Sequence, residues 1–119
     1  MIEVTISGPR GGRIGIEDEQ LIYNYVVEAC RQLKIVDADI EVLLYNKFPK
    51  DYDYAIGYCY GDKESVTIEL TKEDDDMYQT LAHEMVHCKQ FLEGRYPSEL
   101  EAKKLEFGLH EKITEGIGY

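Results

Sequence analysis

The chain has 119 residues, of which 44% are hydrophobic and 31% are charged, and its formal net charge is −11. These values predict one water-soluble domain over residues 1–119. With 13 basic residues against 24 acidic ones, the chain has little from which to build the basic face of a nucleic-acid-binding protein. No apolar run approaches the roughly 20 residues that cross a bilayer, and the N-terminus does not resemble a signal peptide. We therefore expect a cytoplasmic protein without a membrane or nucleic-acid partner.

The N-terminal third predicts a short strand, a mobile loop at residues 7–13 and an amphipathic helix at residues 17–34. In the helical segment, apolar residues recur at steps of four, three and four, namely at Ile22, Val26, Ala29 and Leu33. Acidic residues 17–19 stand at the positive N-terminal end of this helix. The glycine-rich loop lacks the residue order of a phosphate-binding motif, so we expect no nucleotide site there.

Three extended segments follow, at residues 40–45, 54–60 and 65–70. They are rich in β-branched and aromatic residues, and the third alternates, with Val66, Ile68 and Leu70 on one side. The pair Gly61-Asp62 predicts a hairpin between the second and third segments. Together with the helices, these segments predict an α+β fold with one small, mostly antiparallel sheet.

Two helices are predicted in the C-terminal part of the chain. The first should follow Thr71 as N-cap, contain acidic residues in its first turn and end at Gly94. The second should follow Ser98, which forms a capping-box pair with Glu101. The cysteines are widely spaced and predict buried, reduced thiols rather than disulfides: Cys30, Cys59 and Cys88.

The first of these two helices carries the pattern His-Glu-x-x-His at residues 83–87. On a helical wheel its apolar side chains form one stripe, made of Met77, Leu81, Met85, Cys88 and Leu92. His83 and His87 lie together on another face, one turn apart, with Glu84 beside them. Two histidines at i and i+4 can each give a nitrogen to one zinc ion. We therefore predict His83 and His87 as metal ligands and Glu84 as general base; the alternative is a pair of surface histidines.

A catalytic zinc site needs a third protein ligand besides an open position for water. The candidates after the pattern are Glu99, Glu101, Glu106 and His110. Glu101 is expected to reach back to the amide of Ser98 as part of the helix cap, whereas Glu99 stands at the inner edge of the first turn. We predict Glu99 as the ligand, with Glu101 as second choice. Glu106 and His110 should be solvated or lie around the ligands.

The segment Leu-Ala-His-Glu-Met-Val-His-Cys-Lys-Gln, followed by Pro-Ser-Glu-Leu-Glu-Ala, resembles small His-Glu-x-x-His metallopeptidase-like proteins of bacteriophages and bacteria, of the minigluzincin type. The resemblance covers residues 40–107. It implies an N-terminal helix, a small sheet whose rim strand can align a peptide, and one zinc ion held by two histidines and a glutamate. In the gluzincin pattern Glu-x-x-x-Asp the glutamate ligand maps onto Glu99. The aspartate, which partners a zinc histidine in that pattern, is replaced by Lys103.

Three functions are compatible with these features. In a zinc peptidase, zinc acidifies its bound water, and Glu84 takes the proton as the hydroxide attacks a peptide carbonyl. A latent or non-proteolytic zinc protein would use the same fold as a binding module, which Lys103 and the small size favour. A DNA-associated SprT-like protease is disfavoured by the acidic charge and by the poor match around His110. We expect the first function, with a peptide or protein as substrate.

Overall fold

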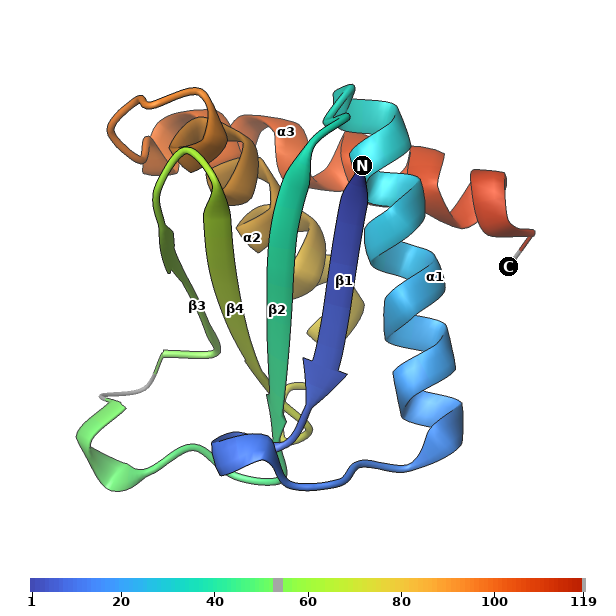
Figure 1. Ribbon diagram of the computed structural model, residues 1–119, viewed down its shortest axis with the longest axis vertical. Helices are drawn as coiled ribbons and strands as arrows, with labels where there is room; N and C mark the ends of the chain where they lie inside the picture. The colour runs from blue at the N-terminus through green and yellow to red at the C-terminus, as the bar shows by residue number, and fades with distance from the viewer. Residues whose placement is uncertain (53–54, 119) are drawn as a thin grey trace.

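A computed structural model describes residues 1–52 and 55–118, which form a compact domain with three α-helices on one side of a four-stranded sheet (Figure 1). The strands are β1 (Ile2–Ser7), β2 (Ala38–Tyr45), β3 (Gly57–Gly61) and β4 (Ser65–Thr71). The helices are α1 (Ile16–Leu33), α2 (Met77–Leu92) and α3 (Glu99–Ile117), and short 3-10 turns lie at Pro9–Gly11 and Lys50–Tyr52. The predicted α+β class is confirmed. None of the helices in the described part of the chain is both long and apolar enough to cross a membrane.

The sheet is mixed, with strand order β1-β2-β4-β3, so the prediction of a mostly antiparallel sheet is wrong. β2 pairs in parallel with both β1 and β4, and β3 pairs antiparallel with β4. Helix α1 returns the chain to the end of the sheet where β1 begins, so β2 runs parallel to β1. The predicted β3–β4 hairpin is confirmed. It inserts β4 between β2 and β3, which makes β4 parallel to β2.

Several predicted segments differ in detail from those observed. β3 begins at Gly57, and residue 54, where the second extended segment was expected to start, lies outside the described residues. Thr71 does not cap α2, because it pairs with Tyr45 as the last residue of β4. Asp74 takes part in the helix start instead, since its carboxylate accepts hydrogen bonds from the amide of Asp76 (3.0 Å) and the hydroxyl of Thr80 (2.5 Å). A 3-10 turn occupies part of the expected loop at residues 7–13.

The core lies between the sheet and the helices. Alternate residues of β2 and β4 face it: Ala38, Ile40, Val42 and Leu44, and Val66, Ile68 and Leu70. The predicted stripe of α2 faces it as well, with Leu81, Met85 and Cys88 fully buried and Met77 and Leu92 packed at its margin. All three cysteines are free thiols, of which Cys59 is only half-buried.

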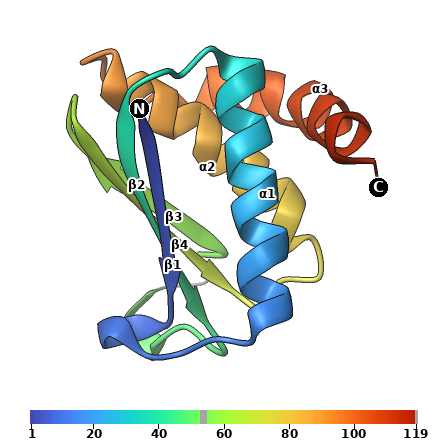
Figure 2. The same ribbon diagram turned by 45° about the vertical axis from the view of Figure 1, so that its right-hand side comes forward.

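Helix α2 lies between the sheet and α3. It packs on β3 and β4 on one side and on α3 on the other, and α3 also contacts α1. Figure 2 shows α3 on the side of α1 and α2 that faces away from the sheet. This arrangement turns the polar face of α2 toward the start of β3 and the first turns of α3, where the predicted site residues lie.

Candidate metal centre

Two histidines from α2 and one glutamate from α3 meet in the structure. His87 Nε2 lies 2.6 Å from Glu99 Oε1, and His83 Nε2 lies 3.2 Å from Glu99 Oε2. The centroids of the two imidazole rings are 4.9 Å apart, with the rings nearly perpendicular. One ligand atom from each of the three side chains lies within 4.8 Å of the others. These three residues, which are those predicted, could therefore hold a metal ion.

The turn between α2 and α3 brings Glu99 to the histidines. Gly94 has a φ of 71°, in the left-handed region, and ends α2 as predicted. Ser98 Oγ accepts a hydrogen bond from the amide of Glu101 (3.2 Å), so α3 begins at Glu99 as predicted. Glu99 thus stands at the first position of α3, on the side that faces α2.

Gln90, which the sequence analysis did not single out, joins His87 to this turn. Its side chain is fully buried. Gln90 Oε1 lies 2.8 Å from His87 Nδ1 and also accepts from the amide of Ser98 (2.9 Å). Its Nε2 donates to the carbonyl of Ser98 (3.2 Å). Because a carboxamide oxygen accepts, His87 donates to Gln90 through Nδ1, and Nε2 is the nitrogen that faces Glu99 and could bind a metal.

Glu101 points away from the two histidines. Its carboxylate accepts from Gln90 Nε2 (2.9 Å) and pairs with Arg95 (3.0 Å). Arg95, followed by Gln90, holds the pKa of Glu101 below its ordinary value. The expected return bond from Glu101 to the amide of Ser98 is absent, because Gln90 Oε1 accepts from that amide. Of the two candidate third ligands, the structure therefore places Glu99 at the histidines.

The pKa values of Glu99 and Glu84 are shifted in opposite directions. Burial acts to raise the pKa of Glu99, but its contacts with His87 and His83 outweigh this effect and lower it. Glu84 is only 6% exposed, and burial raises its pKa to about 7 against the opposing effect of the two histidines. Glu99 is thus an anionic group suited to a cation, whereas Glu84 can both accept and release a proton near neutrality.

The start of β3 lies directly against Glu84. A Cβ atom at Gly57 would approach Glu84 Oε2 to 3.0 Å and Thr80 Cγ2 to 2.7 Å. The second distance is shorter than real Cβ contacts, so a larger residue here would displace its neighbours. Glycine at this position therefore lets the edge strand pass close to α2.

An aromatic cluster on the face of the sheet opposite the helices supports the segment that leads into β3. Tyr45 and Tyr52 donate hydrogen bonds to the buried carboxylate of Glu69 (2.6 and 2.8 Å), and Tyr58 donates to the carbonyl of Tyr52 (2.8 Å). The hydrogen bond to Glu69 raises the pKa of Tyr45, which therefore stays a donor. The rings of Tyr52 and Tyr58 also pack edge to face at 5.0 Å. These contacts join Tyr52, in the second 3-10 turn, to Tyr58 of β3.

A cavity of about 320 Å³ opens beside the three possible ligands. Its lining consists of Ala55, Ile56, Gly57, Thr80, His83, Glu84, Glu99, Lys103 and Glu106. Glu106 Oε2 lies 3.7 Å from His83 Nδ1. Glu106 therefore lies beside one of the possible ligands, as predicted. His110 is not part of this cavity: its Nδ1 forms a hydrogen bond with the hydroxyl of Tyr25 (2.7 Å).

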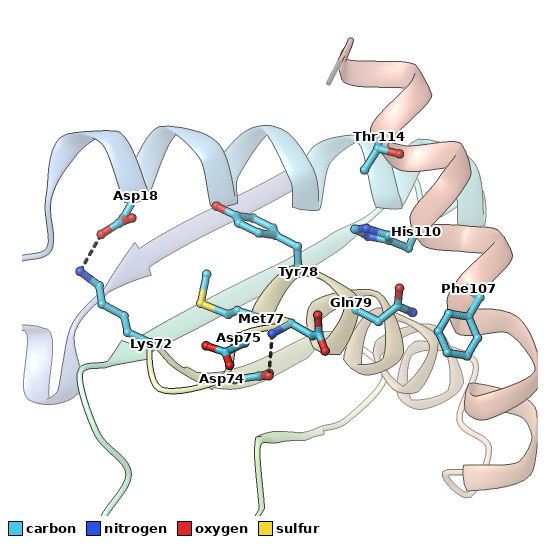
Figure 3. Close-up of a pocket in the computed structure, with 11 residues that line it drawn as sticks. Asp18, Lys72, Asp74, Asp75, Met77, Tyr78, Gln79, Phe107, His110 and Thr114 are labelled. Atoms are coloured by element: carbon cyan, nitrogen blue, oxygen red, sulfur yellow. Dashed lines mark hydrogen bonds and ion pairs between the residues drawn. The ribbon is translucent and has the colours of Figure 1, made fainter.

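A larger pocket, of about 720 Å³, lies between the starts of α1 and α2 and the second half of α3 (Figure 3). Its charged and polar lining includes Asp18, Lys72, Asp74 and His110. Lys72 forms an ion pair with Asp18 at 2.7 Å, and the contacts of Asp74 and His110 are those given above. Within the described residues, the group His83, His87 and Glu99 is the one with the geometry to hold a metal, so the larger pocket contributes no such group.

Comparisons of the chain with protein-family models, with curated proteins and with solved structures found no match. The likeness to minigluzincins therefore remains a prediction from residues 40–107. What the structure adds is the convergence of the predicted ligands and the surroundings of Glu84, and any functional conclusion rests on those features.

Proposed function

We propose that this protein is a zinc-dependent peptidase of the minigluzincin type, in which His83, His87 and Glu99 hold one zinc ion. The observation that carries the proposal is the meeting of these three ligand atoms within 4.8 Å, beside the buried carboxyl group of Glu84. Imidazole nitrogens and a carboxylate oxygen are ligands that suit zinc. Three protein ligands of this kind are typical of catalytic zinc sites rather than structural ones, which use four.

Glu84 is proposed as the general base. Zinc bound at this site would supply Lewis acidity, which makes water a nucleophile at neutral pH. Glu84 would take a proton from the attacking water and later give it to the leaving amine. Burial supports both steps, because it raises the pKa of Glu84 to about 7, so neither protonation state is strongly disfavoured near neutrality.

The free edge of β3 is the proposed place for the substrate backbone. β3 is one of the two edge strands of the sheet, and among the described residues only β4 pairs with it. An extended peptide can add to such an edge through backbone hydrogen bonds. Because β3 starts at Gly57 against Glu84, a peptide bound there would pass the general base. This arrangement supports a peptide or protein as the substrate.

A zinc-binding protein without peptidase activity is the alternative. One observation favours this alternative: within the described residues, no close hydrogen bond orients the ring of His83 through its Nδ1. Among its ion pairs, the group nearest to that atom is the carboxylate of Glu106, whose Oε2 lies 3.7 Å away, a separation longer than a hydrogen bond. His87 has a close partner in Gln90, whereas the aspartate expected to orient a zinc histidine is replaced by Lys103. Such a protein would bind zinc through the same three ligands and use the cavity only for binding.

The test compares the parent with Glu84→Gln after purification without a metal-affinity step. We expect about one zinc ion per chain in both, measured by mass spectrometry of the metal, because the substitution keeps the size of a residue that is not a ligand. Cleavage of a peptide library should occur with the parent and vanish in Glu84→Gln. Glu111→Gln, an exposed change on α3, is the matched control and should behave as the parent. A zinc-loaded parent that cleaves no peptide would support the alternative, and a chain without zinc would contradict both proposals.

A further inference from the structure

Among the described residues that line the cavity beside the possible metal ligands, Lys103 is the single lysine or arginine. It lies on α3 one turn after Glu99 and is exposed to solvent. The peptidase mechanism proposed above gives Lys103 no task.

The two carboxylates that could neutralise Lys103 are directed elsewhere. Glu99 is four residues before it and Glu106 three residues after it, spacings at which helical side chains of opposite charge commonly pair. Glu99 instead contacts both histidines, and Glu106 is turned toward His83. In the described part of the chain, Lys103 has neither an ion pair nor a side-chain hydrogen bond, unlike Lys72 and Arg95. Its ammonium group is therefore available to an anion that enters the cavity.

We propose that Lys103 binds a carboxylate of the substrate next to the metal-binding residues. The carboxylate is either the C-terminal group of a short peptide or the side chain of an aspartate or glutamate near the scissile bond. A bound zinc ion would offset the charges of Glu99 and Glu106, which leaves Lys103 as the remaining cationic group of the lining. Apart from Lys103 and from His83, Glu99 and Glu106, the rest of the lining consists of neutral residues and Glu84. This inference rests on the proposed function and specifies its substrate class.

The test uses a dipeptide hydroxamate, whose head group binds zinc, in three forms. One form ends in a free carboxylate, one ends in a carboxamide, and one ends in a carboxamide but carries a glutamate side chain. Affinities for the zinc-loaded protein are measured by calorimetry at low ionic strength. We expect at least one carboxylate form to bind about fivefold more tightly than the neutral form, an effect limited by the exposure of Lys103. The form that is preferred identifies the source of the carboxylate.

Three variants of exposed lysines complete the test. The preference should disappear in Lys103→Gln, reverse in favour of the neutral form in Lys103→Glu, and persist in the matched control Lys104→Gln, whose side chain does not line the cavity. Equal affinities of the parent for all three forms, or a preference that persists in Lys103→Gln, would overturn the inference. If peptides are cleaved but the three forms bind equally, the peptidase proposal stands and this inference fails. If the preference is found in a chain that cleaves nothing, the carboxylate site stands and the peptidase proposal fails.

Discussion

The two cavities bordered by α2 and α3 differ more in chemistry than in position. In the larger one, of about 720 Å³, Lys72 is paired with Asp18 and the carboxylate of Asp74 accepts hydrogen bonds from Asp76 and Thr80. The smaller one, of about 320 Å³, is lined in part by His83 and three glutamates, and two of these residues, His83 and Glu99, form with His87 the group that could hold a metal ion. The ligand atoms of that group lie within 4.8 Å of one another, whereas the described residues of the larger pocket offer no such group. Volume alone would therefore not have indicated the residues that could hold a metal ion.

The largest expected effect is on zinc content, and it distinguishes the two possible histidine ligands from His110 in the larger pocket. His83→Ala or His87→Ala should abolish zinc binding, because each removes one of three ligands. His110→Ala, in the larger pocket, should keep about one zinc ion per chain and lose roughly 1 kcal/mol of stability with its hydrogen bond to Tyr25. Metal analysis and thermal unfolding of the three variants measure these outcomes. Equal zinc content in all of them would end the distinction between the cavities.

The second prediction separates two glutamates on the first turn of α3. Glu99→Ala should lower zinc affinity by orders of magnitude, because it removes the carboxylate that contacts both histidines. Glu101→Ala should keep the zinc and lower the free energy of unfolding by roughly 1 kcal/mol through the lost bond from Gln90. Competition with a chelator and thermal melts of the zinc-loaded variants test this pair. Zinc loss in Glu101→Ala alone would assign the ligand to the other residue.

The third prediction compares Gln90, which contacts His87, with Gln79, which lines the larger pocket. Gln90→Leu should weaken zinc binding about 10- to 100-fold, because it removes the partner that orients His87. It should also destabilise the fold by about 1–3 kcal/mol, since the amide of Ser98 loses its acceptor. Gln79, which lines the larger pocket, has a buried Nε2 without a hydrogen-bond partner in the described structure, so Gln79→Leu should be close to neutral in both measurements. Similar zinc affinities for the two variants would refute the orienting role of Gln90.

The smallest expected effect concerns two glycines. Gly57→Ala should reduce stability by about 1–3 kcal/mol and disturb the cleft at Glu84, because its Cβ would lie 2.7 Å from Thr80 Cγ2. Gly108→Ala is the control within α3, where no atom lies within 4 Å of the added Cβ, and should stabilise the helix by about 0.5–1 kcal/mol. Urea unfolding of both variants measures the difference. A neutral Gly57→Ala would show that the approach of β3 to α2 is not close.

Features governed by local chemistry were predictable from the sequence. The turn at Gly94, the cap at Ser98 and the placement of His83 and His87 on one helix face all follow from residue spacing, and each is observed. Because the turn and the cap set where α3 begins, the position of Glu99 could be inferred as well.

Features that depend on distant residues were not predictable in this way. The direction of β4 depends on where the hairpin enters the sheet, and the local pattern of residues 65–70 is the same for either direction. The role of Gln90 depends on a buried amide that meets Ser98 from another helix. A polar residue three positions after His87 has no distinguishing sequence signal, since on a helix surface it would simply be solvated.

The most direct test of the metal centre is a crystal structure of the zinc-loaded protein with anomalous scattering recorded at the zinc edge. We expect one anomalous peak, about 2.0–2.2 Å from Nε2 of His83, Nε2 of His87 and a carboxylate oxygen of Glu99. Gln90 should remain hydrogen-bonded to His87 Nδ1 in that structure. A peak in the larger pocket, or one coordinated by Glu101 in place of Glu99, would contradict the proposed site.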